Sequence, residues 1–283
     1  MKFSKKQVKK AKLLAYKALF GRWDRVKKYF WFILALQVYK FITYFTFNPS
    51  KGKLLEAFYL VNRYLDDVGD GDTRLGMTPQ DRINYLLRKR EFTLNPNEPQ
   101  DEIEHLILYY QCLVKKRGED FTDPAIDIVD SIIFDAKRLG GSIIHKQRTL
   151  EENYHLLDEK GTVSPMLWLF KENPNILAEL SYLARAVRTY YNLRDLRGDI
   201  VKGHINISAE DVELYQLNLY PMLLKIETPT EIEKWFQGQA QEGLRLLAIH
   251  RKSLFEKPFR VFTRLVLWLM YERSARAFLI KIS

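Results

Sequence analysis

Two groups of aspartates, far apart in the chain, could do chemistry by their type and spacing. The first comprises Asp66, Asp67 and Asp70, and the second comprises Asp195 and Asp199. Carboxylates four residues apart lie on one face of an α-helix, where they can share a hard cation. Two such helices that face each other could hold several Mg²⁺ ions around one polyanionic group, for which a diphosphate is the best candidate.

Aromatic and cationic residues accompany each aspartate group on the same helical face. At about 100° per residue, Tyr59, Arg63, Asp66 and Asp70 fall within a sector of roughly 60°, with Asp67 to one side. The second helix places six residues on one face, namely Arg188, Tyr191, Asn192, Asp195, Asp199 and Lys202.

Either group alone could equally be a charged surface that faces water, but both lie in otherwise apolar helices. Carboxylates in such helices need cations, or they become neutralised. Arg63, Arg194 and Lys202 would add positive charge for phosphate oxygens. A calcium loop beginning at Asp66 is excluded, because the Glu expected at loop position twelve falls on Met77.

Other phosphate and metal motifs are absent from the sequence. It contains no GxxxxGK[ST], GxGxxG, HExxH or CxxC, which gives no support to a nucleotide loop, a dinucleotide site or a zinc site. His145, His155 and His250 have no ligand spacing, so we expect them to be ordinary surface or core residues.

The elements that must position the aspartates are predicted to be helices. Only 13 Gly and 10 Pro interrupt 283 residues, and no window shows strand alternation flanked by turns. The sequence predicts one all-α domain over 26–283, preceded by a basic amphipathic extension over 1–25. The predicted helices span 4–20, 26–46, 51–70, 78–91, 100–117, 123–146, 150–171, 174–201, 208–226, 229–252 and 257–280.

Positive charge is concentrated at the N-terminus. Residues 1–53 contain fourteen Lys and Arg and a single acid, Asp24, whereas the whole chain has a net charge of +10. Lysines there alternate with apolar residues at helical spacing, which favours peripheral contact with an anionic membrane over nucleic-acid binding and leaves an ordinary solvated helix face as the main alternative. The apolar segment Phe30 to Phe47 is interrupted by Gln37 and Lys40, so we expect a buried core helix and no membrane span.

The compartment follows from the same features. No signal peptide is evident, and the single cysteine, Cys112, suits a reducing environment. We therefore expect a cytoplasmic protein, with attachment to the inner membrane face as an option.

The ordered set of motifs resembles the squalene/phytoene synthase family, the head-to-head branch of the trans-prenyltransferases. Tyr59, Arg63 and the Asp66–Asp70 segment match its first signature, and Leu193 to Asp195 with Asp199 match its second. Between them, Gly161-Thr162-Val163 resembles the AGxVG turn of the family. The resemblance covers roughly residues 28 to 280 and implies a class I isoprenoid synthase-like helical bundle with a central cavity.

The resemblance also implies roles for individual residues. Asp66, Asp67, Asp70, Asp195 and Asp199 would bind Mg²⁺, and Tyr59 would join Asp66, Asp70, Asp195 and Asp199 in catalysis. The substrate, a prenyl diphosphate, would be bound by Arg63, Arg194, Arg188, Lys202, Tyr191 and Asn192. Metal ions and arginines would neutralise the departing diphosphate and leave an allylic cation.

Several positions depart from the family pattern. Tyr191 stands where the family has a metal-binding Asn, Arg188 where it has Gln, and Asn206 where it has Tyr. The segment Asp158-Glu159-Lys160 lies in a region where the family has tyrosines. Three functions therefore stay open. The first is head-to-head coupling of two farnesyl or geranylgeranyl diphosphates, the second is cyclisation or lysis of one prenyl diphosphate on the same scaffold, and the third is a non-catalytic assembly or binding role.

Overall fold

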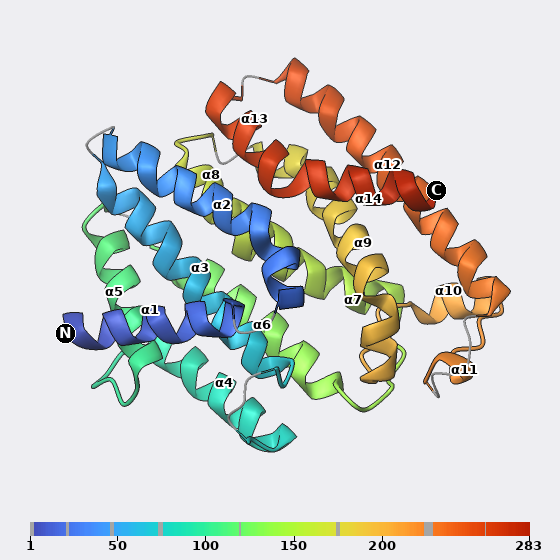
Figure 1. Ribbon diagram of the computed structural model, residues 1–283, viewed down its shortest axis with the longest axis horizontal. Helices are drawn as coiled ribbons and strands as arrows, with labels where there is room; N and C mark the ends of the chain where they lie inside the picture. The colour runs from blue at the N-terminus through green and yellow to red at the C-terminus, as the bar shows by residue number, and fades with distance from the viewer. Residues whose placement is uncertain are drawn as a thin grey trace. The chain divides into compact units, whose positions relative to one another are not determined.

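The computed structural model consists of helices joined by short connections (Figure 1). It describes residues 3–20, 23–45, 48–72, 76–118, 120–173, 176–223, 229–257 and 259–283. Within those ranges no β-strand occurs, which confirms the predicted all-α class. Two compact units make up the chain, unit 1 over 1–136 and unit 2 over 137–283, and each is described by itself. The predicted boundary at residue 25 stays a prediction.

Unit 1 is organised around α3, whose sequence carries the first aspartate group. Its helices are α1 (Lys5–Phe20), α2 (Trp23–Phe45), α3 (Pro49–Gly69), α4 (Pro79–Leu94), α5 (Glu102–Lys115) and α6 (Thr122–Arg138), the last of which ends two residues into unit 2. The helix α3 packs against α1, α2, α4 and α5. Leu54, Ala57, Leu60 and Leu65 are buried along it, so α3 is the central helix of this unit.

Local sequence explains where these helices begin. Pro49 starts α3 at a position that needs no backbone N–H donor. At the start of α4, the Thr78 side chain accepts from the Asp81 backbone N–H, and the Asp81 side chain accepts from the Thr78 backbone N–H. Asp101 caps α5 by accepting from the Glu104 backbone N–H at 2.9 Å.

Unit 2 is organised around α9, which carries the second aspartate group. After the end of α6, its elements are α7 (Gln147–Tyr154), a π-helical segment η1 (His155–Val163), α8 (Ser164–Leu169), α9 (Leu177–Val201), α10 (Ala209–Leu214), α11 (Tyr220–Leu223), α12 (Thr230–Glu256), α13 (Val261–Leu267), a π-helical segment η3 (Trp268–Glu272) and α14 (Arg273–Ile282). The longest helices, α9 and α12, pack along each other. A Cβ at Gly243 of α12 would lie 2.9 Å from Leu279 and 3.4 Å from Thr189, so this glycine permits close approach to α14 and α9.

Two segments predicted as single long helices are shorter or divided in the structure. The helix predicted over 123–146 ends at Arg138, because Gly140 has φ +80° and the chain turns there. Over the described residues of the helix predicted at 208–226, the chain forms the short helices α10 and α11, with Gln216 between them at φ +51°; 224–226 lie outside the described residues.

The prediction that Phe30 to Phe47 forms a buried core helix is wrong for one side of α2. Ile33, Leu36 and Tyr39 are buried, whereas Phe41 and Tyr44 are among the most exposed large side chains. Helix α2 therefore carries apolar residues on both faces. Among its described residues, those on one face are buried and those on the other are exposed.

Candidate functional site

The first aspartate group lies at the C-terminal end of α3 and is held by Arg63. The Arg63 guanidinium donates to both Asp66 and Asp67, which lie three and four residues later on the same helix. Asp67 is completely buried, whereas Asp66 and Asp70 are partly exposed. Arg63 thus neutralises the buried Asp67 carboxylate. It also contacts Asp66, which solvent or a ligand can reach.

Asp70 lies among other carboxylates. Burial and the nearby charge of Asp66 raise its pKa well above the usual range, Arg63 opposes this shift, and Asp135 and Asp72 add to it. Asp135 belongs to α6, so two helices contribute to this carboxylate group. Carboxylates gathered in this way favour the binding of a further cation.

A close helix crossing brings Asp135 to this site. Gly69 of α3 is buried, and a Cβ at this position would lie only 2.8 Å from Cγ2 of Ile132 on α6. Asp135 follows Ile132 by three residues and therefore lies on the same side of α6. The glycine inside the first aspartate group thus allows α6 to approach closely enough for Asp135 to influence Asp70.

The donor set suits magnesium. Among the described residues, no three His, Cys, Asp or Glu side chains converge closely enough to form a complete cation site. Magnesium is commonly held by one or two carboxylates together with water and substrate phosphates. The carboxylates of Asp66, Asp70 and Asp135 offer hard oxygen ligands of the kind that this ion prefers.

The second aspartate group lies near the C-terminal end of α9, in unit 2. Arg194 binds Asp195 through two hydrogen bonds, Nε to Oδ1 at 3.0 Å and Nη2 to Oδ2 at 2.7 Å. The same guanidinium donates to the Tyr190 hydroxyl at 3.1 Å and lies 4.9 Å from the centroid of the Tyr191 ring. Burial raises the pKa of Tyr191, which keeps this phenol neutral.

Asp199 is held by a residue that follows the helix. The Asn206 amide donates to Asp199 Oδ2 at 3.2 Å, and the Asn206 amide oxygen accepts from Arg138 Nη2 at 2.5 Å. Arg138 is fully buried and also donates to the Ile205 carbonyl at 2.9 Å. A buried arginine therefore fixes the amide that orients Asp199.

The turn after α9 places Asn206. Gly203 has φ +73°, and a Cβ there would lie 2.9 Å from the Gly140 Cα. The backbone N–H of Gly140 donates to the Lys202 carbonyl at 2.8 Å, which joins this turn to the segment that follows α6. Lys202 itself is exposed at the end of α9.

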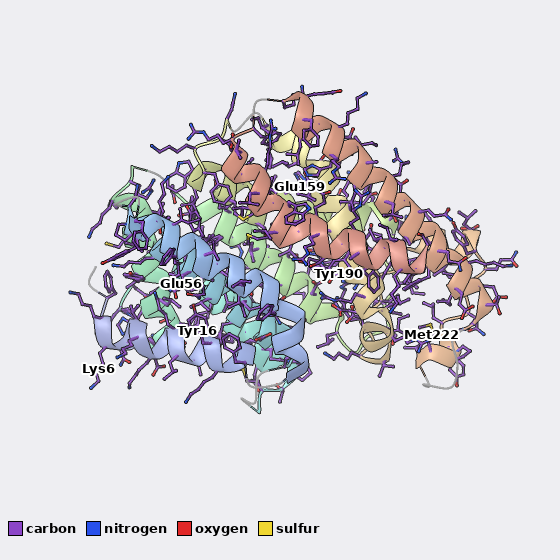
Figure 2. All side chains as sticks on the ribbon, turned by 45° about the horizontal axis from the view of Figure 1, so that its top comes forward. Lys6, Tyr16, Glu56, Glu159, Tyr190 and Met222 are labelled. Atoms are coloured by element: carbon purple, nitrogen blue, oxygen red, sulfur yellow. The ribbon has the colours of Figure 1, made fainter. Side chains whose placement is uncertain are left out.

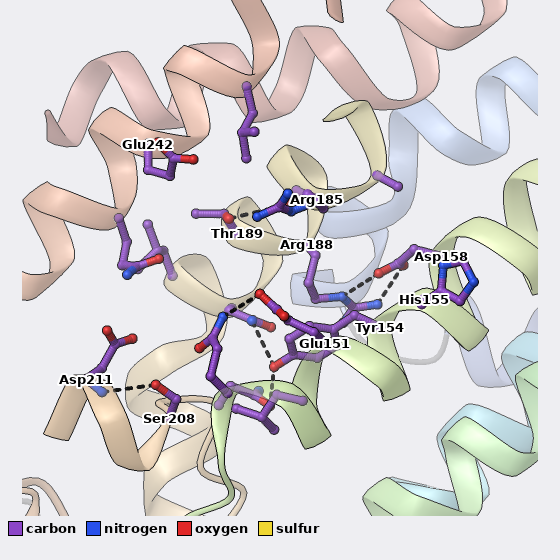
Figure 3. A pocket seen from close by; sticks show the side chains of 18 of the residues that line it. Glu151, Tyr154, His155, Asp158, Arg185, Arg188, Thr189, Ser208, Asp211 and Glu242 are labelled. Carbon is purple, nitrogen blue, oxygen red and sulfur yellow. Dashed lines mark hydrogen bonds and ion pairs between the residues drawn. The ribbon is translucent and has the colours of Figure 1, made fainter. Parts of the chain in front are cut away.

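A cavity of about 540 Å³ opens beside α9 within unit 2 (Figure 3). Its walls come from α7, η1, α9, α12 and the 206–211 segment. Of the residues predicted to share one face of this helix, Arg188 and Asn192 line the cavity, together with Tyr154, Asp158 and Asn206. Arg188 binds Asp158 through two hydrogen bonds, Nε to Oδ2 at 2.8 Å and Nη2 to Oδ1 at 2.7 Å.

Polar contacts connect this cavity to the second aspartate group. Asn192 donates to the Tyr154 hydroxyl at 3.1 Å, and that hydroxyl donates to the Asn206 amide oxygen at 3.3 Å. Asn206 in turn contacts Asp199. The Arg188 guanidinium lies 5.0 Å from the Tyr154 ring centroid and 5.8 Å from that of Tyr191. Arg188 thus contacts Asp158 and Tyr191 directly, and Tyr154 connects it to Asn206.

The structure places the predicted residues in two sets. Tyr59, Arg63, Asp66, Asp67 and Asp70 lie on α3 in unit 1; Arg188, Tyr191, Asn192, Arg194, Asp195, Asp199 and Lys202 lie on α9 or at its end in unit 2. The prediction that the two sets face each other across a central cavity stays a prediction, as do the roles given to these residues.

Sequence reasoning missed Asp135, Asp158 as a partner of Arg188, and the Arg138–Asn206 contact. One signal was available for Asp135. It lies seven residues after Ile128 and three after Ile132, so an acid occupies the apolar face of α6.

Comparisons with known proteins bear on the fold. No protein-family model and no curated protein sequence matches the chain. Among solved structures, the chain is similar to squalene synthase HpnC from Alicyclobacillus acidocaldarius, with a TM-score of 0.65. The similarity covers 99% of this chain and 95% of that chain at 11% sequence identity. The chain has the all-α isoprenoid synthase fold. This agrees with the fold that the sequence resemblance predicted.

Proposed function

We propose that the chain is a Mg²⁺-dependent enzyme that ionises allylic prenyl diphosphates such as farnesyl or geranylgeranyl diphosphate, and couples two of them head-to-head. The observation that carries this proposal is the gathering of Asp66, Asp72 and Asp135 near Asp70, whose negative charges raise the pKa of the Asp70 carboxyl and favour a bound cation. The isoprenoid synthase fold and the squalene synthase activity named for HpnC support it.

The chain's own residues would bind and orient the substrate. Asp66 and Asp70, with Asp135 beside them, would hold metal on α3, and Asp195 and Asp199 would hold metal on α9. Bound magnesium would supply positive charge that stabilises the diphosphate as it leaves. Arg63 and Arg194 would exchange part of their contact with neighbouring carboxylates for contact with diphosphate oxygens. The allylic C–O bond breaks, and its electron pair stays with the diphosphate.

The remaining predicted residues take supporting parts in this proposal. Asn206 would keep the Asp199 carboxylate in place, and Tyr59, one turn before Arg63, would complete the polar stripe of α3. Tyr191 would keep Arg194 oriented through the contact between its ring and the guanidinium. Arg188 would shape the cavity wall through Asp158, while Asn192 and Lys202 would contact substrate.

A second candidate is the ionisation of one prenyl diphosphate, followed by cyclisation or release. The Arg188–Asp158 pair favours it, because a two-bond ion pair fills a stretch of cavity wall where the family has uncharged residues. Packing a second hydrocarbon chain against charged side chains is unfavourable, because it removes water from them.

Product analysis tests both candidates. Purified protein is incubated with farnesyl or geranylgeranyl diphosphate and Mg²⁺, while released diphosphate and extracted hydrocarbons are measured. A product with twice the carbon number supports coupling, and a single-substrate hydrocarbon or alcohol supports the second candidate. Unchanged substrate would contradict both and favour a binding role.

Single variants connect the activity to the aspartates. Asp66→Ala and Asp195→Ala should abolish diphosphate release and keep the helical circular dichroism spectrum. The control is Asp130→Ala, which removes an aspartate of α6 that is paired with Arg90 of α4 and has no predicted role. Turnover retained in Asp66→Ala or Asp195→Ala would contradict the metal assignment.

A further inference from the structure

The outer faces of α1 and α2 expose large apolar side chains on the surface of unit 1. These side chains form what we call the α1–α2 outer face: Leu13, Leu14 and Phe20 on α1, and Phe30, Leu34, Val38, Phe41, Tyr44 and Phe45 on α2. On α2 they recur every three or four residues over four turns, so they form a continuous stripe. Contiguous exposed apolar surface of this kind marks an interaction site more often than chance exposure does.

The C-terminal end of the stripe is an aromatic cluster. Phe41, Tyr44 and Phe45 are 64%, 69% and 61% exposed. Ring centroids lie 4.5 Å apart for Phe41 and Phe45 and 5.8 Å apart for Tyr44 and Phe45. Aromatic side chains gather where a protein meets the headgroup region of a membrane, because one end of the ring is apolar and the phenol of Tyr can stay wet.

The opposite side of α2 is fixed to the core, so the stripe cannot rotate inward. Leu36, Tyr39 and Thr43 are buried. A Cβ at Gly52 of α3 would lie 2.4 Å from Thr43 Oγ1 and 2.8 Å from the Lys40 Cα, which shows how closely α2 lies on α3. The exposed apolar residues of α2 therefore lie outside the core of unit 1.

A buried carboxylate holds α1 beside α2. Glu56 of α3 accepts from Lys12 Nζ at 2.5 Å, from the Tyr16 hydroxyl at 2.7 Å and from Lys40 Nζ at 2.5 Å. Gln37 of α2 also donates to the Tyr16 hydroxyl at 3.2 Å. Figure 2 shows Tyr16 close to Glu56 and Lys6 toward the far end of α1. The basic helix and the apolar stripe are thus fixed next to each other.

The charge around this face is positive. Residues 1–53 contain fourteen Lys and Arg and one acid. Glu56 binds Lys12 and Lys40, while Lys5, Lys6, Lys9, Lys10 and Lys17 of α1 are exposed. Lysines beside exposed aromatic and aliphatic groups complement an anionic lipid surface, to which each cation contributes electrostatic attraction.

We propose that the α1–α2 outer face docks the chain on the surface of an anionic lipid bilayer. None of the helices within the described residues is long and apolar enough to cross a bilayer. A second copy of the chain is a poorer occupant, because pairing this face with itself would bring two strongly basic segments together. Phe41, Tyr44 and Phe45 enter the interface, and the α1 lysines contact lipid phosphates.

Vesicle binding tests the proposal without any measurement of turnover, so its failure is distinct from failure of the proposed enzymatic function. The full chain is sedimented with vesicles of phosphatidylcholine alone or with added phosphatidylglycerol. Wild type should bind the anionic vesicles and lose binding as salt rises. The triple variant Phe41→Ser, Tyr44→Ser, Phe45→Ser should bind at least about tenfold more weakly, and so should Lys9→Glu, Lys10→Glu.

The matched control is Leu214→Ser on α10, since Leu214 is 75% exposed but lies outside the α1–α2 outer face. It should bind as wild type does, and all variants should keep the wild-type circular dichroism spectrum. Three results would overturn the proposal: no binding of wild type to anionic vesicles, equal binding by the triple variant, or an equal loss in Leu214→Ser. Light scattering that shows a wild-type dimer split by the triple variant would instead assign this face to a second copy.

Discussion

Arg188 and Asp158 form a two-bond ion pair between α9 and η1, 30 residues apart in the chain. Each residue departs from the squalene/phytoene synthase pattern when considered alone. In the structure they are partners, so each supplies the charge that the other needs at a site that is mostly covered. The two departures are best understood as one paired feature of the cavity wall.

A double-mutant cycle on this pair should show coupling. Arg188→Gln or Asp158→Asn leaves a charge unpaired and should each lower the free energy of unfolding by about 2 kcal/mol. The double variant should lose less than the sum, with a coupling energy of about 1–2 kcal/mol in urea unfolding. The control cycle uses the exposed Arg245–Glu242 pair on α12, whose coupling should stay below about 0.5 kcal/mol. Equal coupling in both cycles would contradict the importance given to the cavity pair.

The all-α class and the two polar helical faces could be predicted from the sequence because they depend on local periodicity, whereas the isoprenoid synthase fold was predicted from the resemblance. Tyr59, Arg63, Asp66 and Asp70 follow the 3.6-residue repeat of α3, and the scarcity of Gly and Pro indicates an all-α chain. The residues that the prediction missed depend on contacts between distant segments. Asp135 reaches Asp70 because Gly69 permits a close crossing, and Asn206 reaches Asp199 because Gly203 turns the chain back.

The local sequence also does not determine where a helix ends or which of its faces is exposed. The predicted helix over 123–146 contains apolar residues on both sides of Gly140, and only the left-handed backbone at that glycine ends α6. The apolar character of α2 is evident in the sequence, but hydropathy cannot show which apolar side chains stay exposed. Phe41 and Tyr44 are exposed because α3 covers only the other side of the helix.

Asp70→Asn should stabilise the metal-free protein. The pKa of Asp70 lies well above its usual range because of burial and neighbouring carboxylates, so its ionised form costs stability at neutral pH. Replacing it with the neutral amide should raise the free energy of unfolding at neutral pH. Added Mg²⁺ should raise the unfolding temperature of wild type, and this increase should be lost in the variant.

The control for this prediction is Asp130→Asn, which removes a carboxylate of α6 that is paired with Arg90 of α4. It should keep the increase in unfolding temperature with Mg²⁺. If Mg²⁺ stabilises wild type and Asp70→Asn equally, the ion binds elsewhere and the assignment of Asp70 is wrong.

Gly69→Ala should destabilise the protein although alanine favours helix. Relative to glycine, alanine in a helix contributes about 1 kcal/mol. At this position the new Cβ would lie 2.8 Å from Cγ2 of Ile132, and the resulting overpacking should cost about 1–3 kcal/mol more than that gain. Ile132→Leu removes the second γ-carbon and should partly restore the stability of Gly69→Ala.

Gly198→Ala is the matched control, because Gly198 lies in α9 and a Cβ there meets nothing within 4 Å. This variant should stabilise the protein by up to about 1 kcal/mol. Urea unfolding measures both variants. The free energy of unfolding should fall in Gly69→Ala and rise in Gly198→Ala. Equal stabilisation by both substitutions would show that the α3–α6 contact can relax at no cost.

His250 should make the protein less stable in mild acid. It is completely buried on α12, neither ring nitrogen has a hydrogen-bond partner among the described residues, and burial lowers its pKa from 6.5 to about 4. Between these values the unfolded chain binds a proton and the folded chain does not. The contribution of His250 to stability is therefore undiminished above pH 6.5 and falls as the pH falls toward 4, by about 2 kcal/mol at pH 5.

His250→Leu should remove this loss, because leucine has a similar volume and no proton to bind. Unfolding free energies at pH 7.5 and pH 5 should therefore differ by about 2 kcal/mol less in the variant than in wild type. At pH 7.5 the variant should be at least as stable as wild type, since a buried imidazole without hydrogen bonds is replaced by an apolar group. His155→Gln, at an exposed position on η1, is the control and should keep the acid-induced loss of wild type. An unchanged loss in His250→Leu would mean that another buried group causes the acid sensitivity.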